Sequence, residues 1–121
     1  MTMAQPNIVN VSSILGTSEV KVLTTTLTTT LVTAASDKVL KMNLIRCTNI
    51  TDNDATVDFD VEVAGTHKKI ANEVTVPANS VVDITDKNSS FYLMETDLLR
   101  GGSSAATTID VLISYEILDD A

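Results

Sequence analysis

Two segments of the chain alternate apolar and polar residues with a period of two. From Val57 to Val63 every odd position is apolar and every even position is acidic. From Ile109 to Ile117 the odd positions are again apolar, and only Leu112 interrupts the polar positions. Because successive side chains of a strand point to opposite faces, this pattern predicts two antiparallel strands, each with one buried face and one hydrated face.

The alternation also predicts which side chains meet in the core. The apolar faces expected to pack together are Val57, Phe59, Val61 and Val63 on the first strand and Ile109, Val111, Ile113 and Tyr115 on the second. Asp58, Asp60 and Glu62 are expected to face water. Together with the acidic turn before them they do not form an EF-hand, because the twelfth position from Asp52 is Val63 and no glycine occupies the sharp-turn position.

Further strand candidates are rich in β-branched residues and are separated by clusters of turn-forming residues. They lie at residues 8–14, 20–25, 28–34, 39–48, 67–76, 81–85 and 91–95. Gly101–Ser104 is predicted to be the hairpin loop that leads into the last strand. No helical periodicity is present, and 121 residues are enough for one core. The sequence therefore predicts an all-β chain that folds as a single antiparallel β-sandwich, jelly-roll-like and of about eight strands.

The N-terminal segment is expected to form an extended arm outside the sandwich. We place the arm at residues 1–19 and the sandwich domain at residues 20–121. The part before residue 17 carries more apolar surface than is expected of a terminus left in water. The side chains concerned are Ile8, Val9, Val11, Ile14 and Leu15. They are predicted to act as an assembly arm that adds a strand to a neighbouring subunit. Packing of the same segment on its own sandwich is the alternative.

The charge of the chain limits its partners. Sixteen acidic and eight basic residues give a net charge of −8, which repels phosphates, so we expect no nucleic-acid partner. No apolar run reaches the roughly 18 residues of a membrane-spanning helix, and the N-terminus lacks the pattern of a signal peptide. We therefore expect no membrane partner, and synthesis in the cytoplasm of a host cell.

Few residues are available for catalysis. His67 is the only histidine and stands beside Lys68 and Lys69, where a solvated strand start is the expected role. No serine occupies a glycine-flanked nucleophile elbow. Cys47 is the only cysteine and is expected to be a buried apolar side chain. One cysteine and one histidine cannot supply the four ligands of a structural zinc site. The sequence predicts no enzyme, no metal site and no cofactor.

The chain carries short motifs in a recognisable order. They are Arg46–Asn49, Thr75–Ser80, Tyr92-Leu93 followed by Asp97–Leu99, Ser104–Ala106, Ile109–Val111 and Ser114–Ile117. This order resembles small virion structural proteins of tailed bacteriophages, especially those of marine and cyanobacterial phages. In that family a Val-Pro-Ala-Asn turn, a Tyr-Leu-x-x-Gly-Asp step, a Ser-Ala-Ala loop and a terminal strand similar to Ser-Tyr-Glu-Glu-Ile recur in a β-sandwich. The resemblance spans about residues 22–118.

Two departures from the family pattern concern a turn and the arm. Glu95–Asp97 replaces the glycine-containing turn, and Met1–Gly16 lies outside the pattern. The resemblance implies a capsid decoration or cement protein that assembles as a homo-oligomer on the major capsid protein, or on other virion proteins, in the virion. A tail or head–tail connector component is the first alternative. A glycan-binding or receptor-binding sandwich is the second, and the absence of Trp disfavours it because sugar-binding platforms are rich in aromatic rings.

Overall fold

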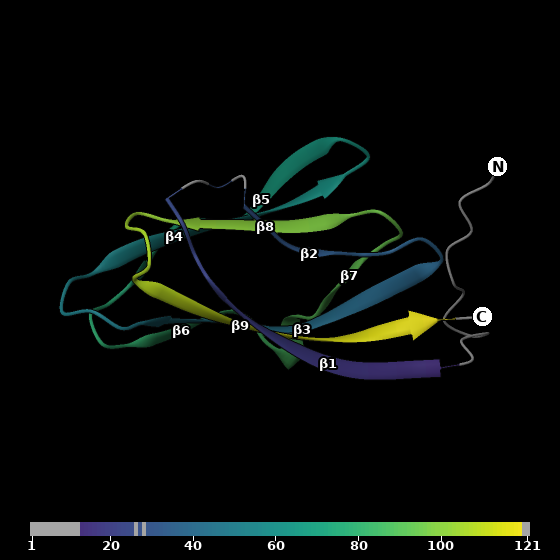
Figure 1. Cartoon of the computed structure of the whole chain (residues 1–121), viewed down its shortest axis with the longest axis horizontal. Coiled ribbons are helices and arrows are strands. Elements are labelled where there is room, and N and C mark those ends of the chain that lie inside the picture. Colours follow the sequence, from purple (N-terminus) through teal and green to yellow (C-terminus); the bar gives the residue numbers. More distant parts are fainter. Residues whose placement is uncertain (1–12, 26, 28, 120–121) are drawn as a thin grey trace.

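The protein's structure is a computed structural model that describes residues 13–25, 27 and 29–119. Within these residues two antiparallel sheets face each other, and no α-helix is present (Figure 1). Sheet A contains β1 (Ser13–Val22), β9 (Ile109–Asp119), β3 (Lys38–Asn49), β6 (Val81–Thr85) and β7 (Phe91–Leu93). Sheet B contains β2 (Thr29–Thr33), β8 (Leu98–Ser103), β4 (Ala55–Val63) and β5 (Thr66–Val76). A short 3₁₀ helix, η2 (Lys87–Ser89), lies between β6 and β7. The predicted all-β sandwich is confirmed.

The strand pairings are nested along the chain. In sheet A, β1 pairs with β9, and β3 pairs with both β6 and β7. In sheet B, β2 pairs with β8, and β4 pairs with β5. Because the first four strands alternate between the two sheets, the chain forms one long nested hairpin wrapped around the core. This connectivity is that of a jelly roll, in which β6 and β7 share a single strand position beside β3.

The core between the sheets is almost entirely aliphatic. All four apolar positions predicted for the last strand are buried, and Val57 and Phe59 of β4 lie in the same cluster, as predicted. Phe59 is the only aromatic ring among the fully buried side chains of the described residues. The largest other side chains that are fully buried are Leu23, Met42, Ile45, Leu93, Leu99, Ile109 and Ile113. Aliphatic packing therefore supplies most of the apolar stabilisation.

The second half of β4 departs from the predicted core. Val61 is half-buried and Val63 is exposed, although both were expected to point into the core. The tip of the hairpin formed by β4 and β5 rises away from the strands of sheet A (Figure 1). Alternation fixes the face to which Val63 points, but no opposing sheet covers that face there. The prediction for Val63 is therefore wrong.

Asp60 is a second correction in β4, because its side chain is buried instead of facing water. It keeps its place on the outer face of sheet B, opposite Arg100 of β8. The Arg100 guanidinium donates to it from Nε to Oδ1 at 2.8 Å and from Nη2 to Oδ2 at 2.5 Å. A buried carboxylate needs such a partner.

The glycine-rich segment predicted as a hairpin loop is instead part of a strand. Gly101, Gly102 and Ser103 belong to β8 and are buried. A Cβ on Gly101 would lie 2.8 Å from Cε2 of Phe59 and 2.9 Å from Cδ1 of Leu31. Glycine is needed at position 101 because the Phe59 ring occupies the space that a side chain would fill. The close packing of this ring against the backbone, and not a turn, therefore explains the glycine.

The boundary predicted between arm and sandwich lies inside a strand. β1 begins at Ser13, so residues 13–19 belong to sheet A and not to a separate arm. Ile14 and Leu15 lie opposite Leu118 and Ile117 of β9 in the protein's own sheet. Ile8, Val9 and Val11 lie outside the described residues. For Ile14 and Leu15, strand pairing with the protein's own β9 is therefore the observed arrangement, and both side chains are exposed.

Candidate interaction surface

Cys47 and His67 are the only cysteine and the only histidine of the chain, and they lie in different parts of the fold. Cys47 is fully buried in sheet A, and burial, together with the charge of Asp83, raises the pKa of its thiol to about 12. The side chain is thus a neutral thiol at physiological pH, as predicted. His67 lies on the exposed β4–β5 hairpin, with its Nε2 3.1 Å from Oε1 of Glu62. In the described part of the chain, no three His, Cys, Asp or Glu side chains are grouped so as to hold a metal ion.

Asn49 organises the turn that follows β3. Its side chain is buried, and its Nδ2 donates to the carbonyls of Asn53 at 2.7 Å and Val76 at 3.0 Å. Its Oδ1 accepts from the backbone N of Thr51 at 2.9 Å and from its Oγ1 at 2.8 Å. Every polar atom of this amide is therefore satisfied, which accounts for an asparagine in a buried position.

The turn Pro77–Ser80 packs against the same acidic turn. The backbone N of Ala78 donates to Oδ1 of Asp54 at 2.9 Å, and the side chain of Asn79 donates to Oδ1 of Asp52 at 3.0 Å. Asn79 has a φ of 54°, a conformation that asparagine tolerates better than most residues. Two of the motifs that carry the phage resemblance thus form one hydrogen-bonded unit, and the two aspartates act there as turn acceptors.

The turn Glu95–Asp97 connects sheet A to sheet B. Thr96 has a φ of 68°, which is the left-handed region that favours glycine. Its backbone N donates to the carbonyl of Ala34 at 2.9 Å, and Oδ2 of Asp97 accepts from the N of Met94 at 3.0 Å. In the phage pattern that the sequence resembles, glycine is expected at the position of Thr96. The departure noted in the sequence therefore falls on a residue whose backbone requires the glycine conformation.

Strand β1 forms the most apolar exposed region of the described surface. Val20 is 78% exposed and Ile14 is 63% exposed, and Leu15 and Val22 are also exposed. Beside them lies an open hollow of about 350 Å³ on the outer face of sheet A. Its lining residues are Val20, Lys21, Val22, Thr48, Asp110, Val111 and Leu112. Exposed apolar side chains gathered in this way are typical of an interaction surface.

Sequence reasoning identified only part of this surface. It assigned Ile14 and Leu15 to an assembly arm, but it placed Val20 and Val22 in a sandwich strand. The sequence does alternate here, because Val20 and Val22 flank the charged Lys21. In the structure the alternation is reversed: the valines face water, and Glu19 and Lys21 lie on the core side, opposite Ile113 and Val111. Glu19, for example, accepts a hydrogen bond from the hydroxyl of the buried Tyr115.

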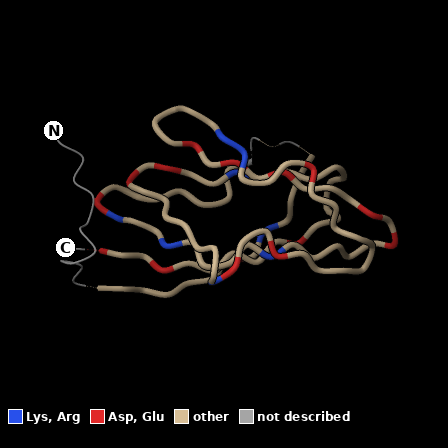
Figure 2. Tube along the Cα trace, turned by 180° about the vertical axis from the view of Figure 1, so that it is seen from behind, with Lys and Arg blue, Asp and Glu red and all other residues tan. Residues whose placement is uncertain are grey.

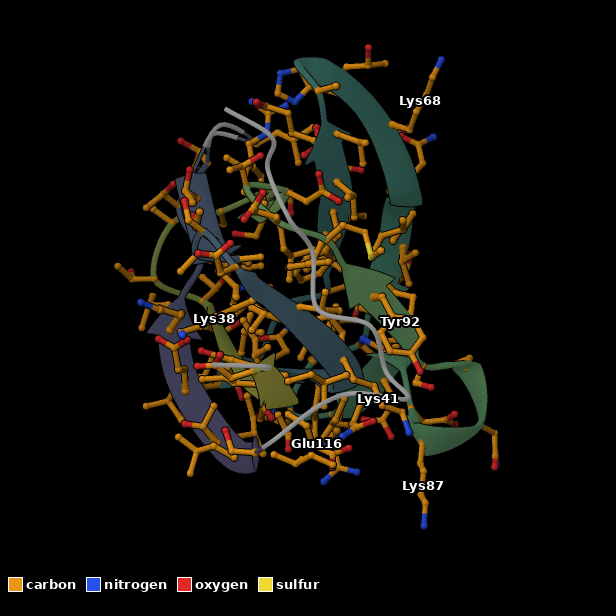
Figure 3. The ribbon with its side chains drawn as sticks, turned by 90° about the vertical axis from the view of Figure 1, so that its right-hand side faces the viewer. Lys38, Lys41, Lys68, Lys87, Tyr92 and Glu116 are labelled. Atoms are coloured by element: carbon orange, nitrogen blue, oxygen red, sulfur yellow. The ribbon has the colours of Figure 1, made fainter. Side chains whose placement is uncertain are left out.

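A second hollow of about 300 Å³ lies on the same face, and most of the residues that line it are polar or charged. Lys41, Lys87 and Glu116 line it, and Glu116 accepts a hydrogen bond from Asn43 at 3.1 Å. Figure 3 shows Lys41 and Lys87 on the side of the molecule that also carries Tyr92, and Lys68 at the distant tip of the β4–β5 hairpin. The basic residues therefore do not gather into one patch. Acidic positions recur in both layers, whereas β1 is uncharged over most of its length (Figure 2).

Within the described residues, no helix has the length and apolar character needed to cross a membrane. The described residues thus include two turns joined by hydrogen bonds, a buried thiol and an exposed apolar strand. No family model matches the chain, and no curated protein matches its sequence.

Proposed function

We propose that the protein is a non-enzymatic structural protein of a tailed-phage virion that decorates the capsid surface as a homo-oligomer. The observation that carries this proposal is the exposed apolar strand β1. The polar side chains of Asn49, Asp52 and Asp54, by contrast, form hydrogen bonds within the protein's own turns. A surface of this kind loses contact with water on assembly, and burial of apolar area drives association. The expected partners are other copies of the chain and the major capsid protein.

The motifs of the phage resemblance support the proposal through their structural roles. Asn49 and the Pro77–Ser80 turn hold one end of the sandwich together, and Thr96 occupies the position where the family has glycine. Such motifs recur because a fold requires them, and not because a reaction does. A jelly roll is also found in lectins and cupins, so the fold alone does not select the function.

The N-terminal segment extends the proposed surface. It carries Ile8, Val9 and Val11 and leads directly into β1. We propose that it acts as an assembly arm for a neighbouring virion protein. Removing residues 1–12 leaves β1 whole. The truncated protein is expected to fold but to bind particles more weakly, and unchanged binding would rule out the arm.

Copy number in purified particles tests the proposed location. Quantitative mass spectrometry with isotope-labelled peptides, applied to virions of the phage that encodes the chain, measures copies per particle. On the order of hundreds of copies are expected for a decoration protein that follows the capsid lattice. Roughly six to twelve copies would assign the chain to the neck or tail instead. Absence of the chain from purified particles would overturn the virion role altogether.

A further inference from the structure

We propose that two copies of the chain pair edge to edge through β1. Sheet A then continues across a two-fold axis from one copy into the other. This interface gives a defined contact to the homo-oligomer of the proposed function, and to that extent it rests on that function. The partner surface is a second copy of this chain.

β1 is the one sheet edge of the described residues that is long and regular. It pairs ten residues with β9, from Ser13 opposite Asp119 to Val22 opposite Asp110, without a register shift. Its other edge faces no strand in the described part of the chain. An edge of this length presents a row of unpaired backbone donors and acceptors, which is a template for another strand.

The other sheet edges are protected in ways that β1 is not. β5 carries Lys68, Lys69 and Glu73, and Glu73 has a φ of 48° beside a register shift in the pairing with β4. β2 and β6 are five residues long, and each has a register shift. β7 has three residues. Short length, charge and bulges are the usual devices that prevent edge pairing.

The charge of β1 favours self-pairing over other contacts between copies. The whole chain has a net charge of −8, whereas β1 contains one acidic residue, Glu19, and one basic residue, Lys21. Two copies of an acidic protein repel each other over most of their surfaces. They meet with the least repulsion at the neutral edge.

The pattern of β1 also fits a two-fold axis perpendicular to the sheet. Such an axis keeps the outer face of both copies on the same side, so residues opposite each other must have the same parity. Pairing centred on Thr17 places Ile14 of each copy opposite Val20 of the other. It places Glu19 opposite Leu15 and Lys21 opposite Ser13, so no like charges face each other. Apolar cross-strand pairs on the outer face stabilise such a ladder.

The first test is the mass of the full chain in solution, by size-exclusion chromatography with light scattering. We expect a dimer, and Val20→Lys is expected to weaken it at least tenfold because lysine on an edge strand opposes pairing. Val81→Lys is the matched control, since Val81 is also an exposed valine on sheet A but lies on β6. Circular dichroism checks that both variants fold. A monomeric native chain at about 100 µM would overturn the proposal.

The second test is a disulfide at the axis. Thr17→Cys places two thiols directly opposite each other, within the Cα separation that a disulfide needs. Oxidation is expected to give a covalent dimer, whereas Ser18→Cys, one position off the axis, is expected to give much less. Cys47 is buried and does not compete. Failure of both variants to cross-link would contradict pairing through β1.

The failures of the two proposals are distinguishable. A monomeric chain present in hundreds of copies on virions would reject the β1 dimer and keep the decoration role. If the Thr17→Cys variant forms a cross-linked dimer but the chain is absent from virions, the decoration role is rejected and the β1 dimer is kept. If Val20→Lys leaves the mass in solution unchanged but abolishes binding to capsids, the edge serves a capsid segment and self-pairing is wrong.

Discussion

Sheet A and sheet B are built from strands of similar composition, but they are stabilised differently. In sheet A, β9 pairs along its whole length with β1 without a register shift and with β3 with one shift. In sheet B, the β4–β5 pairing shifts on both sides of Phe59, and the β2–β8 pairing shifts once. The β1–β9 ladder of sheet A is therefore long and regular, whereas sheet B depends on particular side-chain contacts at its irregular positions.

The buried ion pair of sheet B has a more exposed counterpart in sheet A. Asp60 and Arg100 form a bidentate ion pair in sheet B, with side chains only 3% and 16% exposed. Asp83 and Arg46 form the same kind of pair in sheet A, but these side chains are 34% and 45% exposed. The Arg46 hydrogen bond lowers the pKa of Asp83 below its usual range. Sheet B is thus expected to tolerate single substitutions less well.

The largest expected difference concerns the two ion pairs. Asp60→Ala leaves the guanidinium of Arg100 without its partner, and we expect it to lower the free energy of unfolding by about 3–5 kcal/mol. Asp83→Ala is expected to cost less than about 1 kcal/mol, because water solvates Arg46 in the variant. Urea unfolding followed by circular dichroism measures both values.

The double variant Asp60→Ala with Arg100→Met provides the control. Removing both charges takes away the unpaired cation, so this protein is expected to be more stable than Asp60→Ala alone. Equal losses for Asp60→Ala and Asp83→Ala would show that burial does not distinguish the pairs. The comparison between the sheets would then lose its main support.

A smaller difference is expected between two glycines. Gly101→Ala in sheet B forces a Cβ to within 2.8 Å of the Phe59 ring, and we expect it to cost about 1–3 kcal/mol through overpacking. Gly16→Ala in sheet A meets no atom within 4 Å and is expected to change stability by less than about 0.5 kcal/mol. The same urea experiment compares them.

Phe59→Leu sharpens this test because it removes the ring that occupies the space beside Gly101. In a Phe59→Leu background, Gly101→Ala is expected to cost less than it does in the native protein. An unchanged cost would mean that the strain arises from backbone conformation or from Leu31. The assignment of Gly101 to close packing with Phe59 would then be wrong.

The difference between the sheets also explains which parts of the fold the sequence predicted. Period-two alternation identified β9 and the first half of β4, because both lie within the area where two sheets overlap. It could not predict that Val63 is exposed, since the β4–β5 hairpin rises away from sheet A there (Figure 1). It could not predict the burial of Asp60 either, because the partner is Arg100, forty positions along the chain.

The glycines were misinterpreted for a local reason, and the exposure of β1 was not predicted. A pair of glycines followed by serines is common in turns, and only the position of the Phe59 ring shows that Gly101 belongs to a strand. Val20 was correctly placed in a strand of the sandwich, but its exposure was not predicted. Its exposure follows from the position of β1 at the edge of sheet A, which is a property of topology and not of local sequence.

The smallest expected effect concerns the turn that joins the two sheets. Thr96 holds a φ of 68°, which costs a β-branched residue roughly 1–2 kcal/mol relative to glycine. Thr96→Gly removes this strain but adds freedom to the unfolded chain, so we expect a net stabilisation of about 0.5–1 kcal/mol. Its backbone N–H still donates to Ala34, so the connection between the sheets is kept.

The melting temperature of Thr96→Gly, measured by calorimetry, should rise by a few degrees. Thr75→Gly, at an exposed position of β5 without a positive φ, is the control and should lower it. A fall for both variants would mean that the backbone of Thr96 is not strained.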